Sequence, residues 1–426
     1  MRAPFTTCAA TIGVLLLSGL AGTASAQQID PSSDLGKFRD YRDTGMQALD
    51  HSDPTAAMAN FIKAEELIPD SPSILILKAQ TAQKQGRLKN AYSFVKQYLN
   101  RGYVMDLKAN PDFHQFWDET FDERQGENMA SQGELTTVSS SPDFAITEGL
   151  TYDADAEKFY VSGVRTGTVT ALSTKGAKDI ITFRAGVAAY GLGLHDGKLW
   201  ATTAATRETK GFDPKSTIPS KIVALDPKTG AVVTTISDPD KTRRFGHILA
   251  GKDDLYVTDS EHGEVLRLNG YAGTLQSLVP EGYMDSPDAL AENSDASVLV
   301  VADFISGLYR VDLATGAMQH LTPPQDGSFL GISYLVRYGN DLIGIQTGFK
   351  PNRVVKFHMS SDWSQVESEE VLARSATDLV QPTQGVIVND AFVFVAKSQW
   401  DNLDSRGNPI KAQPDNAVIA SLHLAP

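Results

Sequence analysis

Two carboxylates stand at the same point of a recurring pattern in this sequence. Glu148 opens the stretch EGLTYD and Asp288 opens DALAENSDASVLVVAD, and each precedes a short apolar strand. The matching positions in the other repeats are Tyr190, Gly246 or His247, Leu330 and Gln384. The fold itself does not require acidic side chains at these positions. Calcium and magnesium, however, prefer oxygen ligands such as carboxylates. The pair therefore indicates a divalent-metal site, with solvated carboxylates as the alternative.

The pattern that carries these residues occurs six times between residues 148 and 426. The repeats begin at 148, 190, 247, 288, 330 and 384, which gives spacings of 42, 57, 41, 42 and 54 residues. A period near 42 is typical of four-stranded propeller blades, whereas a β-sandwich, the alternative, lacks a constant period. The sequence therefore predicts a mainly β fold, a six-bladed β-propeller preceded by a short α-helical tetratricopeptide-like region.

The two ends of the predicted ring must be joined. The last repeat ends with AVIASLHLAP at 417–426, which leaves no room for a fourth strand. The segment ELTTVS at 134–139 precedes the first repeat and lies within a polar linker over 127–141. Because a propeller has to close its ring, we predict that this segment supplies the missing strand of blade six. The propeller itself is expected over 142–426.

The predicted helical domain covers residues 27–126. Apolar residues there recur at intervals of three and four, the period of an amphipathic helix. At an offset of 34, Ala48 aligns with Ala82 and Ala57 with Ala91. Thirty-four is the tetratricopeptide period, and a generic pair of helical hairpins is the alternative. Such repeats usually bind other chains, so the pattern indicates a protein partner for this domain.

The first 26 residues have the features of a secretory signal peptide, with an apolar run at 12–20 and an ASA cleavage pattern at 24–26. Cys8 is the only cysteine, so no disulfide or thiolate metal site is expected after cleavage. The net charge of -14 argues against nucleic acid or an anionic membrane as a partner. We expect an exported, soluble protein of the periplasm or the extracellular space, without membrane insertion.

The repeats over 142–426 resemble the gluconolactonase, senescence-marker-protein and regucalcin family of six-bladed propellers. The resemblance is carried by EGL at 148–150, LYVTDSEHGEVLRL at 255–268 and SPDAL at 286–290. It implies one divalent cation, calcium or zinc, that polarises a lactone carbonyl. It further implies Glu148 and Asp288 as metal ligands, with Asp288 also helping to activate water. The family's acidic ligand would fall near Leu330 and its substrate-facing asparagine at 246–247, and the sequence has neither.

Other candidates belong to the same predicted face of the propeller. His247 is a candidate ligand or base, with a structural histidine as the alternative. Long loops at 201–221 and 397–416 are expected to form the pocket rim, since binding residues concentrate on such loops. The predicted substrate-binding residues are Tyr190, Phe304, Phe349, Gln384 and Trp400.

Two functions fit this sequence. The first is an exported, gluconolactonase-like hydrolase of a lactone or ester that depends on a divalent metal. The second is a non-catalytic propeller that acts as a binding or scaffold protein, with its helical repeats holding a protein partner. Glu148 and the long loops favour the first, and the missing acidic ligand near Leu330 favours the second.

Overall fold

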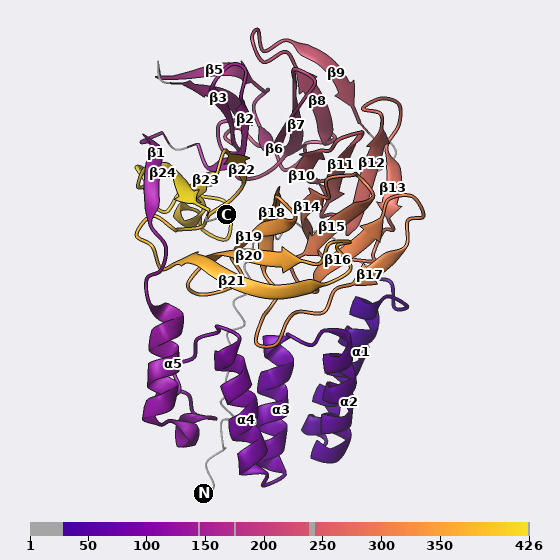
Figure 1. Cartoon of the computed structure of the whole chain (residues 1–426), viewed down its shortest axis with the longest axis vertical. Helices are drawn as coiled ribbons and strands as arrows, with labels where there is room; N and C mark the ends of the chain where they lie inside the picture. Colours follow the sequence, from indigo (N-terminus) through magenta and orange to yellow (C-terminus); the bar gives the residue numbers. More distant parts are fainter. Residues whose placement is uncertain (1–28, 144, 174–175, 238–242, 425–426) are drawn as a thin grey trace, which may run out of the picture.

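A computed structural model describes residues 29–143, 145–173, 176–237 and 243–424 of the chain. The predicted signal peptide at 1–26, including Cys8, lies outside these residues. Figure 1 shows a ring of sheets with a group of helices against one part of it. Over the described ranges no helix is both long and apolar enough to cross a membrane.

Six four-stranded antiparallel sheets form the ring, so the predicted six-bladed β-propeller is confirmed. In chain order the strands of blades one to three are β2 (Thr147–Asp153), β3 (Lys158–Gly163), β4 (Thr168–Ser173), β5 (Gly176–Thr182), β6 (Val187–His195), β7 (Lys198–Ala205), β8 (Lys221–Leu225), β9 (Val232–Ile236), β10 (Phe245–Ala250), β11 (Asp254–Asp259), β12 (Glu264–Asn269) and β13 (Gln276–Val279). Those of blades four to six are β14 (Pro287–Glu292), β15 (Val298–Asp303), β16 (Gly307–Asp312), β17 (Met318–His320), β18 (Ile332–Tyr338), β19 (Asp341–Gln346), β20 (Arg353–Met359), β21 (Val366–Arg374), β22 (Gly385–Val388), β23 (Ala391–Lys397) and β24 (Ala417–His423). The inner strands are β2, β6, β10, β14, β18 and β22.

The sixth sheet closes the ring as the sequence predicted. Its order is β1-β24-β23-β22, where β1 (Leu135–Ser141) comes from before the first blade. The pairing is antiparallel and runs from Leu135 opposite Leu422 to Ser141 opposite Ala417. Both ends of the propeller therefore share one sheet.

Strand β15 shows why these sequences form blades. All six residues of VLVVAD are buried, because both faces of the strand meet another blade. Val300 lies in a core shared with Leu335 of blade five, whereas Val301 lies in one shared with Val265 of blade three. Successive side chains of a strand point to opposite faces, so a run of apolar residues fills two cores at once.

The helical region contains α1 (Asp34–Asp50), α2 (Pro54–Leu67), α3 (Pro72–Lys84), α4 (Leu88–Asn100), a short 3₁₀ turn η1 (His114–Phe116) and α5 (Glu119–Met129). Helix α1 packs on α2 and α3 packs on α4. Ala57, Ala82 and Ala91 are fully buried, as expected where paired helices approach closely. The assignment of these pairs as tetratricopeptide repeats stays a prediction. Helix α5 ends at Met129, three residues beyond the predicted boundary at 126.

Candidate functional site

Five of the six inner strands contain a bulge near their start, where the mouth of the channel was predicted. The register of five inner strands shifts between Thr147 and Leu150, Ala189 and Leu192, Phe245 and Ile248, Pro287 and Ala289, and Ile332 and Tyr334. A bulge adds one residue to a strand and redirects its side chain. The predicted mouth residues Glu148, Tyr190, Gly246 and Asp288 all lie in these bulges. Gln384 directly precedes β22, and its backbone N–H donates to the Glu148 carbonyl (3.2 Å).

The assignment of Leu330 to the mouth was wrong by three residues. The bulge of β18 falls at Ser333, between the paired residues Ile332 and Tyr334. Leu330 instead packs against the apolar cluster of the helical region that includes Leu35. The helical region thus accounts for an apolar side chain just before this strand. The mouth position of blade five carries a hydroxyl and not an acidic side chain.

Glu148 is a partly exposed carboxyl held in place by blade six. The indole Nε1–H of Trp400 donates to its Oε2 atom (2.6 Å). Trp400 begins a short 3₁₀ turn, η2 (Trp400–Asn402), in the long loop of blade six. Burial raises the pKa of Glu148 to about 7, although hydrogen bonds from Trp400 and Gln384 lower it. The carboxyl therefore exchanges its proton near neutral pH.

Asp288 is the second partly exposed carboxyl, and blade four supplies its support. The Ser286 hydroxyl donates to Asp288 Oδ1 (2.9 Å). Burial raises the pKa of Asp288 to about 7, and the charges of Asp303, Glu148 and Asp285 add to the increase. The charge of Glu148 in blade one therefore acts on Asp288 in blade four. In the described part of the chain, neither carboxyl forms an ion pair with a lysine or arginine.

Tyr190 brings an unpartnered hydroxyl to the Glu148 side of the mouth. Its Oη atom is buried, and within the described ranges no partner meets the full geometry of a hydrogen bond. Burial raises the pKa of Tyr190, the charge of Arg244 and the polar side chain of Thr206 lower it, and the charges of Glu208 and then Glu148 raise it further. A buried hydroxyl without a partner costs free energy, so a polar ligand atom at this position would be stabilised.

The side chain of His247 is buried between two blades and is not exposed at the mouth. Its imidazole Nδ1 accepts a hydrogen bond from the Leu290 backbone N–H of blade four (3.1 Å), and the side chain is 5% exposed. Blades one and two have Gly149 and Gly191 in the same place, where a Cβ would approach the next blade's carbonyl oxygen to 2.3 and 2.8 Å. Burial lowers the pKa of His247 to about 3, so the ring is neutral. This geometry favours the structural interpretation of His247.

The two long loops meet above blade one. Strand β7 continues to Ala205, so the blade-two loop covers 206–220. Its Glu208 is 4% exposed and accepts from the side chains of Thr206 and Arg207. Gly407 of the blade-six loop lies so close that a Cβ there would be 3.2 Å from Arg207 Cγ. The predicted rim loops therefore come together beside Glu148.

The structure places the two predicted phenylalanines differently. Phe304 is partly exposed, and its backbone bonds to Ser286 and Gly331 keep it between the loops that lead to β14 and β18. Phe349 is 2% exposed and lies between the Tyr103 ring (centroids 4.3 Å apart) and the Arg353 guanidinium (3.7 Å from the centroid). Its faces are covered, so it serves the contact with the helical region and leaves no surface for a ligand at the mouth.

Two residues near the carboxyls were missed in the sequence. Ser286 holds Asp288, and its position two residues ahead in the SPDAL stretch was the available signal. Ser333 occupies the blade-five bulge, but nothing in GISYLV reveals a bulge. Register shifts depend on pairing with another strand, which a single stretch does not record.

The donor set at the mouth fits calcium better than zinc. Within the described ranges, no group of three or more His, Cys, Asp or Glu side chains is arranged to hold a metal. Zinc sites are usually built from three or four such ligands, whereas calcium accepts carboxylates together with amide, hydroxyl and water oxygens. Glu148, Asp288, Gln384 and Ser333 bear side-chain oxygens in or next to four different inner strands, and the Ser333 hydroxyl already donates to the Ile345 carbonyl (3.4 Å). His247 Nδ1, the ring nitrogen that accepts from Leu290, is already engaged.

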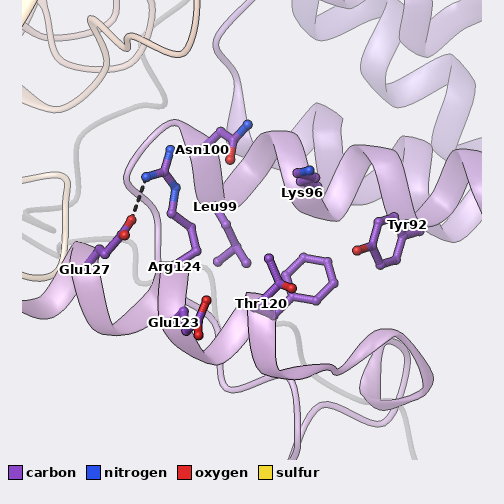
Figure 2. Close-up of a pocket in the computed structure, with 9 residues that line it drawn as sticks. Tyr92, Lys96, Leu99, Asn100, Thr120, Glu123, Arg124 and Glu127 are labelled. Carbon is purple, nitrogen blue, oxygen red and sulfur yellow. Dashed lines mark hydrogen bonds and ion pairs between the residues drawn. The ribbon is translucent and has the colours of Figure 1, made fainter.

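The helical region has hollows of its own. A cavity of about 240 Å³ lies between α4 and α5, with Leu99 and Phe121 as apolar lining and Lys96 at its edge (Figure 2). Figure 2 also shows Arg124 paired with Glu127, at 2.7 Å. A second hollow of about 290 Å³ lies between α1 and α3. Each hollow has two carboxylates in its lining together with a lysine or arginine, whereas Glu148 and Asp288 pair with no such cation in the described ranges.

Comparisons with known proteins identify no family and no activity for this chain. No family model matches the chain, and no curated protein matches it. Among solved structures it is similar to the PQQ-bound form of aldose sugar dehydrogenase from Streptomyces coelicolor, with 12% identity and a TM-score of 0.46 over 69% of this chain and 100% of that chain. It is also similar to the WD40 β-propeller domain of Doa1, with 8% identity and a TM-score of 0.41 over 64% and 78% of the two chains. These scores carry no argument about ligands or chemistry.

Proposed function

We propose that the channel mouth binds a divalent cation of the calcium type through Glu148 and Asp288, and that the chain is an exported hydrolase of a lactone or ester. The observation that carries this proposal is the carboxyl pair itself. Both groups are partly exposed, both have a pKa of about 7, and the charge of Glu148 raises the pKa of Asp288. Like charges held together in a partly buried site favour either a shared proton or a bound cation.

The residues around the pair suit such a reaction. A bound cation would polarise the substrate carbonyl. Trp400 fixes Glu148 by its hydrogen bond, and Ser286 fixes Asp288 in the same way. Asp288, which a bound cation would keep ionised, would accept a proton from the attacking water. The unpartnered Tyr190 hydroxyl would donate to a substrate oxygen.

Calorimetric titration of calcium into chelator-treated mature protein tests the site. We expect saturable binding that Glu148→Gln and Asp288→Asn each abolish. The control is Asp196→Asn, an exposed carboxyl in the turn between β6 and β7. Lactone hydrolysis is then measured with and without chelator. Binding that survives in both variants, or hydrolysis that survives chelation, would contradict the proposal.

A non-catalytic function in which the helical region holds a protein partner is the second candidate. The α1–α3 hollow supports it, because Met46 is 45% exposed there beside Leu49 and Leu77. Met46→Glu should then abolish capture of a partner. Met129→Glu is a matched control, since Met129 is 56% exposed and does not line this hollow. A partner list that Met46→Glu leaves unchanged would count against this function.

A further inference from the structure

Helices hold two of the loops that lead to the channel mouth. One covers 282–286 and leads to β14 and Asp288. The other covers 327–331 and leads to β18 and Ser333. Figure 1 shows α1 to α4 against the part of the ring that contains β17 and β21, the outer strands of the same two blades.

The loop to Asp288 is held from two sides. On the propeller side, Asp303 is fully buried and accepts from the backbone N–H groups of Asp285 (3.1 Å) and Ser286 (2.9 Å). On the helical side, Arg39 of α1 pairs with Asp285 at 2.7 Å, and both side chains are about one-third exposed or less. Ser286 in turn donates to Asp288. A continuous path of polar contacts therefore runs from α1 to the mouth carboxyl.

The loop to Ser333 has the stronger connection with the helices. Asp70, between α2 and α3, is 2% exposed and accepts from the backbone N–H of Phe329 (2.7 Å) and the hydroxyl of Ser328 (3.1 Å). The Tyr103 hydroxyl lies 3.0 Å from the same Ser328 oxygen, and Arg101 donates to the Gly327 carbonyl (2.6 Å). Buried hydrogen bonds of this kind hold a loop in one conformation, because breaking them leaves polar groups unpaired.

The loop to Glu148 is held differently. Its backbone N–H groups at Ile146 and Thr147 donate to Gln399 Oε1 (3.3 Å) and to the Ser398 carbonyl (3.1 Å). Gln399 Nε2 also donates to the Asp143 carbonyl (3.1 Å). All of these partners belong to blade six and to the chain just before blade one. The described contacts of this loop therefore lie within the ring.

We propose that the helical region is the positioning element of the Asp288 half of the mouth, so that the helices are part of the proposed binding site and not a separate arm. The inference rests on the proposed function only for what the mouth binds. It requires that Arg39 and Asp70 keep the lead-in loops of β14 and β18 in place. Neither residue would touch the ligand, so both are positioning residues.

Hydrogen–deuterium exchange of the full mature chain tests this inference without a ligand. The main variant is the double substitution Arg39→Ala with Asp70→Ala. We expect amide exchange at 285–290 and 330–334 to become roughly tenfold faster, with no change at 145–150. The conservative variants Arg39→Lys and Asp70→Asn keep an ion pair and an acceptor, so they should exchange at the wild-type rate. Arg124→Ala is the matched control, because its ion pair with Glu127 lies within α5.

Two results would overturn the inference. Unchanged exchange in the double variant would show that the propeller alone holds these loops. Equal acceleration at 145–150 would show a general loss of stability instead of local positioning.

Calcium titration separates the inference from the proposed function. If wild type binds calcium, the double variant should lose roughly tenfold in affinity, and unchanged affinity would contradict positioning. If wild type binds no calcium, the proposed function fails, and the exchange result still decides the inference.

Discussion

The two halves of the mouth have the same strand geometry but different supports. Glu148 and Asp288 both lie in bulges of inner strands. The Glu148 half is fixed by Trp400 and by the loops of blades two and six, which belong to the ring. The Asp288 half is fixed by loops that also bond to Arg39 and Asp70 of the helical region. One part of a propeller site can thus be supported by the ring itself, while another part depends on contacts with an added domain.

Substitution of Tyr103 should have the largest effect on the contact between the helical region and the Asp288 half of the mouth. This residue is 7% exposed, stacks on Phe349 and contacts the Ser328 hydroxyl. Tyr103→Ala removes a large buried ring at the helix–propeller contact, so we expect a loss of about 4 kcal/mol in the free energy of unfolding. Denaturant unfolding measures it, and Tyr103→Phe, which keeps the ring, should lose only about 1 kcal/mol.

The matched change on the Glu148 half is Trp400→Phe. Trp400 is partly exposed and its indole bonds to Glu148, so we expect a loss of only about 1 to 2 kcal/mol. Equal losses for Tyr103→Ala and Trp400→Phe would contradict the idea that the Asp288 half depends on an added domain.

His247 lies at the border of the two halves and should make the fold sensitive to acid. Its folded pKa of about 3 lies below the ordinary value of 6.5, so the folded state resists protonation. Stability from this group is therefore full above pH 6.5 and falls by about 1.4 kcal/mol per pH unit as the pH drops toward 3. Between pH 6 and 4 we expect wild type to lose about 3 kcal/mol that His247→Asn does not lose.

Denaturant unfolding of the two proteins across that range measures the difference. Asn is the matched choice, because its carbonyl oxygen can accept from the Leu290 N–H that now bonds to His247. Parallel pH curves for wild type and variant would mean that the imidazole is not held neutral between the blades.

The fold was predictable from the sequence, and the site only in part. The near-constant period and the short last repeat were enough for six blades and for closure by β1, because blade cores need the same strand pattern each time. The repeat pattern also located Glu148, Tyr190 and Asp288, which the structure places at equivalent bulges of three inner strands. Ser333 was missed because a bulge depends on the pairing of β18 with β19. The role of Phe349 was missed because its partner Tyr103 is 246 residues away, in another region.

At high pH the ionised carboxylates of Glu148 and Asp288 should each destabilise the folded state. The folded pKa of each group is about 7, above the ordinary values of 4.5 for Glu148 and 3.8 for Asp288. A raised pKa means that stability is full below about pH 4 and is lost as the pH rises to about 7. After allowing for partial exposure, Glu148→Gln and Asp288→Asn should each gain about 2 kcal/mol at pH 8 and nothing at pH 4.

Thermal or denaturant unfolding at the two pH values measures this gain. The double variant should gain less than the sum of the single variants, because each substitution also removes the repulsion that its partner feels. A loss of stability at pH 8 in both single variants would contradict this prediction. It would mean that the ionised carboxylates stabilise the folded state instead of destabilising it.

The smallest expected effect tests the contact between the two rim loops on the Glu148 half. Gly407 has φ of 79°, and a Cβ there would be 3.2 Å from Arg207 Cγ, whereas Gly339 has φ of 61° and nothing within 4 Å of its Cβ position. Alanine at either position costs about 1 kcal/mol of backbone strain, which denaturant unfolding measures. Gly407→Ala should exceed Gly339→Ala by a few tenths of a kcal/mol, because it must also displace Arg207. Equal costs would mean that the two loops beside Glu148 do not support each other.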